Sequence, residues 1–381
     1  MQTQLLNITP EALAQAGALI RSGELVAFPT ETVYGLGGDA LNPEASEKIY
    51  AAKGRPSDNP LIVHICRLED LEGVADRVPP EAYRLAEAFW PGPLTMVLPK
   101  TEKTAKSVSA GLDTVAVRMP SHKVALDIIE TAKLPLAAPS ANTSGSPSPT
   151  AAKHVESDLD GKIDAIVFSN DCAVGVESTV ITFCSNPPRL LRPGAVTAEA
   201  LKEIVPNLII DSAVLTEPQK NAKVESPGMK YKHYAPKTDA FLVEGTKEQF
   251  AKFVNSQENS AAICFEEDSE LIKIPKLIYG NKENPDSLAH EVFATLRDID
   301  KLSVEKVFIH APSKKGVGLA VYNRLLRASG FKVVTLPLII GLTGPTGAGK
   351  SSLKTVAENL GFSVIDCDKV AREATVKGSG G

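Results

Sequence analysis

Short apolar runs alternate with helical stretches along most of this chain, and several runs end at segments rich in Pro, Ser, Thr, Asn and Gly. This alternation predicts an α/β fold, in which loops at strand ends usually bind the ligand. Helices are expected over Thr9–Ser22, with Pro10 in the first turn, and over Pro80–Phe89, which Trp90-Pro-Gly-Pro ends. The strands expected in the first part of the chain are Leu25–Phe28, Leu61–Ile65, Leu94–Leu98, Thr114–Arg118, Leu136–Ala138, Ile163–Phe168 and Ser178–Phe183.

The overall composition narrows the class of protein. A chain of 381 residues, 43% hydrophobic and 23% charged, predicts two or three globular domains. The formal net charge of -5 argues against a general nucleic-acid coat protein. Five scattered cysteines with no C-x-x-C fit reduced thiols and give neither a zinc site nor a disulfide framework. There is no signal peptide and no apolar run of the ~18–20 residues that a membrane span needs, so we expect a cytoplasmic location and no membrane contact.

Composition also divides the chain. Residues 1–210 form a first α/β region, and the polar stretch 211–238 is interpreted as an interdomain linker, which contains SPGMKYKHYAP at 226–236. A smaller α/β region follows at 239–336, and a third segment occupies 337–381. The elements expected in the smaller region are strands at Phe241–Val243, Ala261–Phe265 and Val304–His310 and a helix at Leu319–Ala328.

Six polar segments of the first region are candidates for a binding site. Each alone is compatible with an ordinary turn or a solvated surface loop, and a lone histidine such as His64 on an apolar strand is more often a core residue. Together they place four cations, Lys53, Arg55, Arg118 and Arg192, and many hydroxyl groups near strand ends of one region, as a site for ATP and a carboxylate would require. The segments are PTETVYGLG at 29–37, KGRPSDNP at 53–60, VAVRMP at 115–120, APSANTSGSPS at 138–148, GVESTV at 175–180 and LRPG at 191–194.

The sequence lacks the motifs of covalent catalysis. It contains no Ser-His-Asp elbow, no reactive-cysteine context and no H-E-x-x-H. A covalent nucleophile is therefore not implied, and no protein-bound metal is expected. Positioning and charge neutralisation are the natural mechanism, as in phosphoryl and nucleotidyl transfer.

A phosphate-binding loop is predicted near the C-terminus. Gly344-x-x-x-x-Gly349-Lys350-Ser351 follows a strand-like run, Leu338–Thr343, and precedes a helix-like one, as a Walker A loop requires. Backbone N–H groups would cradle phosphates, Lys350 would reach the outer ones and Ser351 would bind Mg²⁺. Only 30 residues follow Ser351, too few for the remaining strands, a lid and a base pocket, so we expect no kinase activity.

In this order, the six segments resemble the YrdC-type catalytic domain of L-threonylcarbamoyladenylate synthases, and SPGMKYKHYAP resembles the interdomain linker of the two-domain form. The resemblance covers roughly residues 5–336, whereas 338–376 resemble the beginning of dephospho-CoA kinase. It implies a YrdC-like twisted mixed-sheet catalytic domain at 1–210, a linker or lid at 211–238, a smaller Rossmann-like α/β domain at 239–336, and a partial P-loop segment.

The resemblance also implies a reaction: L-threonine, bicarbonate and ATP, with Mg²⁺, give threonylcarbamoyl-AMP and pyrophosphate. The product would pass to the machinery that forms threonylcarbamoyladenosine in tRNA. The residues it places around L-threonine are Thr32, His64, Arg118, the backbone at Ala138, and Ser178. Those it places around ATP are Lys53, Arg55, Asn59, Thr114, Ser140, Ser148 and Arg192, with Asn142 as a secondary candidate and Tyr234 closing over the nucleotide. Lys53, Arg55 and Arg118 are the expected catalytic residues.

Three other functions remain open from the sequence. The first region could instead bind tRNA, although its 18 Lys and Arg against 25 Asp and Glu disfavour affinity driven by phosphate charge. A related carbamoyl-adenylate chemistry could use another acyl acceptor, and that use normally occurs in larger chains with zinc modules. The P-loop segment could be the main function, as part of a kinase.

Overall fold

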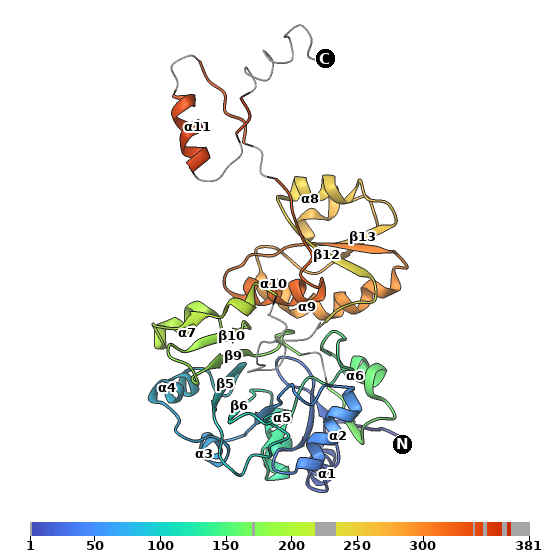
Figure 1. Cartoon of the computed structure of the whole chain (residues 1–381). Coiled ribbons are helices and arrows are strands. Elements are labelled where there is room, and N and C mark those ends of the chain that lie inside the picture. Colours follow the sequence, from blue (N-terminus) through green and yellow to red (C-terminus); the bar gives the residue numbers. More distant parts are fainter. Residues whose placement is uncertain are drawn as a thin grey trace. The chain divides into compact units, whose positions relative to one another are not determined.

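The computed structural model describes residues 2–169, 172–217, 234–337, 340–345, 349–359 and 364–366. It forms two compact units, 1–336 and 337–381, which we describe separately (Figure 1). In the second unit, the predicted helix after the P-loop motif is present as α11 (Lys350–Asn359). The strand-like run before that motif is not a strand over residues 340–343, and residues 338 and 339 lie outside the described part.

The first unit contains a mixed sheet of eleven strands. Their spatial order is β1-β8-β2-β3-β7-β4-β6-β5-β9-β10-β11. The strands are β1 (Gln4–Leu6), β2 (Val26–Phe28), β3 (Gly35–Asp39), β4 (Ile62–His64), β5 (Leu94–Pro99), β6 (Thr114–Arg118), β7 (Leu136–Ala137), β8 (Ala165–Val167), β9 (Thr179–Thr182), β10 (Arg189–Arg192) and β11 (Ile209–Ile210).

Helices cover both faces of this sheet. They are α1 (Pro10–Arg21), α2 (Pro43–Lys53), α3 (Leu71–Val74), α4 (Pro80–Phe89), α5 (Lys123–Ala132), α6 (Ala152–Leu159) and α7 (Ala198–Ile204), with 3-10 turns η1 (Leu68–Asp70) and η2 (Ser212–Val214). Helices α1 and α5 bury Ile20 and Ile128 against Val26 and Phe28 of β2. The remaining helices pack on the opposite face, because alternate residues of a strand point to opposite sides.

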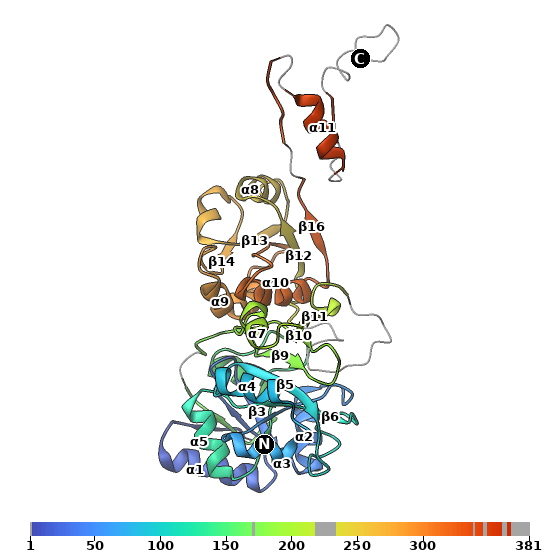
Figure 2. The same ribbon diagram turned by 90° about the vertical axis from the view of Figure 1, so that its left-hand side faces the viewer.

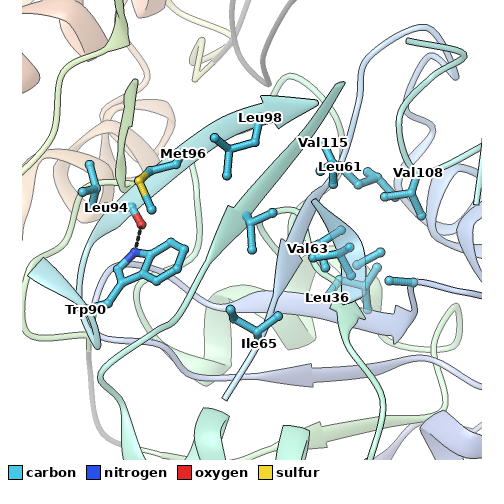
Figure 3. Close-up of a cluster of buried hydrophobic side chains, with 14 of the residues drawn as sticks. Leu36, Leu61, Val63, Ile65, Trp90, Leu94, Met96, Leu98, Val108 and Val115 are labelled. Carbon is cyan, nitrogen blue, oxygen red and sulfur yellow. Dashed lines mark hydrogen bonds between the residues drawn. The ribbon is translucent and has the colours of Figure 1, made fainter. Parts of the chain in front are cut away.

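The larger core lies on that opposite face (Figure 3). Val63 projects from β4 and Met96 and Leu98 from β5, two strands that β6 separates. Trp90 donates its indole N–H to the carbonyl of Leu94 at 2.7 Å. A fully buried aliphatic side chain of this kind contributes roughly 1.5–3 kcal/mol. This core holds the strand ends in a fixed arrangement at the rim of the sheet.

A second sheet of five parallel strands follows in the same unit, in the order β14-β13-β15-β12-β16. Its elements are β12 (Asp239–Glu244), α8 (Lys247–Val254), β13 (Ser260–Cys264), η3 (Glu266–Leu271), β14 (Lys276–Ile278), α9 (Pro285–Asp298), η4 (Ile299–Lys301), β15 (Lys306–His310), α10 (Val317–Ala328) and β16 (Val333–Thr335). Helix α8 packs on one face, and α9 and α10 pack on the other. The α9–α10 face shares a core with Val33 and Val176 of the larger sheet's loops, and Figure 2 shows these helices on the side toward β9 and β10.

The fold confirms the predicted α/β class, the mixed sheet and the second, smaller α/β region, whose five strands are all parallel. Strand β6 and helix α4 have the predicted bounds, and the other predicted strands differ by one or two residues at one or both ends. Strand β3 was not predicted, because three of its five residues are glycine, a poor strand former. The packing explains why residue 37 is glycine, since a Cβ there would lie 2.5 Å from the Phe28 ring. Among the described residues, no helix is long and apolar enough to span a membrane.

Candidate active site

One rim of the larger sheet gathers five strand ends. Parallel strands β4 and β6 both end there, with His64 paired in register to Arg118. Antiparallel β5 begins there, with Thr95 opposite Arg118. Strand β9 begins beside β5, and β10 ends beside β9 at Arg192. The sheet topology therefore brings motifs that are far apart in the sequence together at one site.

A pocket lies at this rim and is lined by residues from all six predicted segments. The predicted site residues that line it are Thr32, Lys53, Arg55, His64, Arg118, Ala138, Ser140, Asn142, Ser178, Arg192 and Tyr234. The wall also includes Ser144, Gly145 and Glu177, which the sequence analysis did not select as site residues. The roles of these residues are taken up below as proposals.

Arg118 is held by three groups. Its Nη1 donates to Thr32 Oγ1 at 2.9 Å and its Nε to the carbonyl of Gly92 at 3.3 Å. Its Nη2 lies 2.7 Å from a carboxylate oxygen of Glu31. Burial alone would raise the pKa of Glu31, but the charge and hydrogen bonding of Arg118 outweigh it, so the pKa lies below its ordinary value. The result is a buried, oriented guanidinium beside the pocket.

His64 is neutral at physiological pH. It is 3% exposed, and its Nδ1 lies 3.2 Å from the carbonyl of Ile62. Burial, followed by the charge of Arg118, lowers the pKa of His64 to about 3. The imidazole can therefore serve as a neutral hydrogen-bonding group next to Arg118, and not as a cation.

Lys53 is the last residue of helix α2, and Arg55 lies just beyond the end of that helix. Asn42 caps the start of this helix, and Gly54, with φ of 60°, ends it in the left-handed conformation. Lys53 Nζ donates to the carbonyls of Ser140 and Asn142, and Arg55 donates to those of Asn59 and Pro60. Burial and then repulsion from Arg55 lower the pKa of Lys53 well below its ordinary value.

Arg192 completes a cluster of positive charge. Its Nε donates to the carbonyl of Ser178 at 2.9 Å and its Nη2 to the Ser178 hydroxyl at 3.1 Å. That hydroxyl also lies 2.7 Å from Thr95 Oγ1. Burial lowers the pKa of both Arg55 and Arg192 to about 10, and repulsion from Arg192 contributes at Arg55. Such mutual repulsion favours an anionic ligand.

The loop after β7 supplies hydroxyl and amide groups. Ser140 Oγ donates to Asn142 Oδ1 at 2.6 Å, and Asn142 Nδ2 donates to the carbonyls of Thr143 and Ser146 at 2.8 and 2.9 Å. The backbone N–H of Ala138 is committed to the carbonyl of Ile62 at 2.9 Å. The Ala138 bond fixes the beginning of this loop against the start of β4.

Three predicted ATP residues do not line the pocket. Ser148 lies behind the wall and donates to Glu177 at 2.6 Å. Asn59 is 1% exposed, and its Oδ1 is buried without a hydrogen-bond partner. Thr114 begins β6 and pairs with Pro99, at the end of the strand away from Arg118.

Tyr234 brings the end of the linker to the pocket. It has a φ of 63°, is 4% exposed and packs on Phe293 of α9 with ring centroids 5.0 Å apart. Burial raises its pKa to about 12. Residues 218–233 of the predicted linker or lid lie outside the described residues.

Two buried carboxylates were overlooked as functional groups. Glu31 and Glu177 occur inside the predicted segments, next to Thr32 and Ser178, and each pairs with an arginine. The sequence signal that could have identified them is an acidic residue inside a segment whose other side chains suit an anionic ligand. Within the described residues, no group of three or more His, Cys, Asp or Glu side chains could hold a metal ion.

Comparison with known proteins agrees with this geometry. A family model described as Telomere recombination, Sua5_yciO_yrdC, matches residues 18–194, and one described as Threonylcarbamoyl-AMP synthase, C-terminal domain, matches 196–330. A dephospho-CoA kinase model matches 338–381.

Whole-length relatives extend this result. The chain is 45% identical to a threonylcarbamoyl-AMP synthase of Pyrococcus abyssi, over 84% of this chain and 94% of the relative. It is 42% identical to that of Bacillus subtilis, over 87% and 97%. A crystal structure of Pyrococcus abyssi Sua5 complexed with L-threonine superposes with a TM-score of 0.81 at 42% identity, covering 88% of this chain and all of that chain.

The fold and site define a YrdC-like catalytic domain followed by a Sua5-type parallel-sheet domain. The chain belongs to the threonylcarbamoyl-AMP synthase family, and the predicted family is confirmed.

Proposed function

We propose that this chain joins L-threonine, bicarbonate and ATP into L-threonylcarbamoyl-AMP with release of pyrophosphate, for the threonylcarbamoyladenosine modification of tRNA. The observation that carries the proposal is the convergence of Lys53, Arg55 and Arg192 in the pocket that also contains Arg118 and Thr32. Three clustered cations suit a triphosphate, and the separately oriented arginine suits a carboxylate.

L-threonine is assigned to the Arg118 part of the pocket. The guanidinium would bind the amino acid's carboxylate, while Thr32, His64 and Ser178 offer polar groups for its hydroxyl and amine. A site built to pair with a hydroxyl discriminates strongly against analogues without one, because its own polar groups are then left unpaired. The backbone at Ala138 would form the adjoining wall.

ATP is assigned to the cationic cluster. Lys53, Arg55 and Arg192 would bind phosphate oxygens, with Ser140, Asn142 and Tyr234 on the surrounding wall. Asn59, Thr114 and Ser148 would act only through neighbouring residues. The residues proposed as catalytic are Lys53, Arg55 and Arg118.

The chemistry needs positioning more than a covalent nucleophile. The threonine amine and bicarbonate form a carbamate with loss of water, and a carbamate oxygen then attacks the α-phosphorus. The bond from the α-phosphorus to the bridging oxygen breaks, and pyrophosphate takes its electron pair. Fixed cations stabilise the charge that builds on the phosphates and the leaving group.

Mg²⁺ would enter as part of the MgATP substrate. Four cationic side chains line the pocket, and its carboxylate Glu177 is already paired with Arg324 and Ser148. The described residues therefore do not form a metal cage, and we assign the ion to phosphate oxygens.

The chain is proposed to consist of four parts. The boundaries are a catalytic domain at 1–210, a linker at 211–238, a smaller domain at 239–336 and a P-loop segment at 337–381. In that segment, Gly344, Gly349, Lys350 and Ser351 would bind phosphate. We also expect a cytoplasmic location, transfer of the product to the tRNA-modifying machinery, and at most weak direct tRNA binding.

The test is pyrophosphate release from MgATP, with L-threonine and bicarbonate omitted in turn. Release that requires both, with the adenylate identified by mass spectrometry, supports the proposal. Arg118→Ala should lower kcat/KM for L-threonine by about 100-fold or more, because it removes a charged partner of the carboxylate. Release independent of both substrates, or tRNA binding without turnover, would support the alternative that the first region binds tRNA.

A further inference from the structure

Arg324 crosses from the smaller domain to the wall of the pocket. It lies on α10 and is fully buried. Its Nε donates to Glu177 Oε2 at 2.8 Å, its Nη2 to the Glu177 carbonyl at 3.2 Å, and its Nη1 to the Pro193 carbonyl at 2.8 Å. It therefore binds two separate segments of the catalytic domain at once.

Those two segments carry residues assigned to the substrates. Glu177 directly precedes Ser178, and Pro193 directly follows Arg192. The segments are in tight contact, since a Cβ on Gly194 would lie 2.4 Å from the backbone nitrogen of Thr179. A shift of either segment would change the hydrogen bonds from Arg192 to Ser178.

Glu177 extends the link to a further segment behind the pocket wall. Its second oxygen accepts the hydroxyl hydrogen of Ser148 at 2.6 Å. Burial alone would raise its pKa, but Arg324 and then Arg192 hold it at about 2, so the carboxylate stays ionised. A buried carboxylate that lost its partner would be strongly destabilised.

We propose that Arg324 is a positioning residue through which the smaller domain completes the ATP-binding part of the pocket. It holds Glu177 and Pro193 so that Arg192 and Ser148 keep their places. This inference rests on the proposed function, because ATP is the ligand assigned to Arg192. It gives the 239–336 region a direct contribution to catalysis by the 1–210 region.

The test is steady-state kinetics of the full chain, with ATP and L-threonine varied separately. Arg324→Met should raise the KM for ATP about tenfold or more, with a smaller rise in the KM for L-threonine, to which Ser178 of the Glu177 segment is assigned. Arg324→Lys keeps the charge and should be less impaired. Glu177→Gln should resemble Arg324→Met, and the double variant should be no worse than the worse single variant, because both changes break one link.

Arg327→Met is the matched control. Arg327 is 5% exposed on the same helix and donates to the Ala213 carbonyl at 2.9 Å. It should lower the melting temperature without raising the KM for ATP more than about twofold. The inference is overturned if Arg324→Met keeps the wild-type KM for ATP. If Arg324→Met does not fold, the inference is overturned when Arg324→Lys and Glu177→Gln both keep that KM. It is also overturned if Arg327→Met raises that KM equally. Failure of the wild type to form the adenylate would instead overturn the proposed function.

Discussion

Glu31 and Arg118 form a buried ion pair beside the pocket, with 2.7 Å between the carboxylate oxygen and Nη2 and side chains 10% and 5% exposed. The pair joins the loop after β2 to the end of β6. It holds the Arg118 guanidinium in a fixed orientation before any substrate arrives.

Glu31→Gln should lower the unfolding free energy by about 3 kcal/mol, because it leaves the Arg118 charge buried without a counter-charge. L-threonine should raise the melting temperature of this variant more than that of the wild type, since its carboxylate restores the missing charge. Urea unfolding can be followed by the fluorescence of Trp90, the single tryptophan. Glu130→Gln is the control, because its pair with Arg67 is 61% exposed on both sides and should contribute about 0–1 kcal/mol. Equal stability of the two variants would contradict the prediction.

Gly175→Ala should lower the unfolding free energy by about 3 kcal/mol or more, because it combines overpacking with a strained backbone. Gly175 has a φ of 82°, and an added Cβ would lie 2.4 Å from the carbonyl oxygen of Ala289 and from the Cα of His290. Gly111→Ala is the matched control: its φ is 78°, but nothing lies within 4 Å, so only strain of about 1 kcal/mol is expected. Urea unfolding of both variants measures the difference, and equal losses would show that the contact with α9 is unimportant.

His64 should make stability depend on pH. Its pKa is about 3 in the folded protein against 6.5 when unfolded, so between these values the unfolded state binds one more proton. The unfolding free energy should therefore fall as pH falls, and His64 should account for about 2 kcal/mol of the loss between pH 7 and pH 5. His64→Gln should remove that part. Urea titrations at the two pH values check this, and an unchanged difference would show that His64 titrates normally.

Tyr234 should contribute through its ring. Tyr234→Ala should lower the unfolding free energy by about 3 kcal/mol, because it removes a buried ring from its contact with Phe293. It should also raise the KM for ATP about tenfold. Tyr234→Phe keeps the ring, so it should leave the unfolding free energy and the KM for ATP near their wild-type values. Kinetics and urea unfolding of both variants separate the ring from the hydroxyl. A normal KM for ATP in both would remove Tyr234 from the ATP site.

Local sequence patterns were sufficient for much of this description. Strand β6 ends at Arg118 as predicted, since Val115, Ala116 and Val117 form a short apolar run before a charged residue and a proline. Helix α4 ends where Trp90 is followed by proline and glycine. The order of the six segments identified the family, which the relatives confirm.

Other features depend on contacts between distant parts of the chain. Strand β3 forms despite its glycines, because Gly37 allows the Phe28 ring to pack against it. The sequence supplied the residue types of the pocket, but only sheet order and register placed His64, Arg118 and Thr95 side by side. Arg324 reaches Glu177 across 147 residues, and no local pattern predicts that pairing. The physical reason is that apolar periodicity encodes which face of an element is buried, whereas the partner of a buried charge is chosen by the three-dimensional packing that surrounds it.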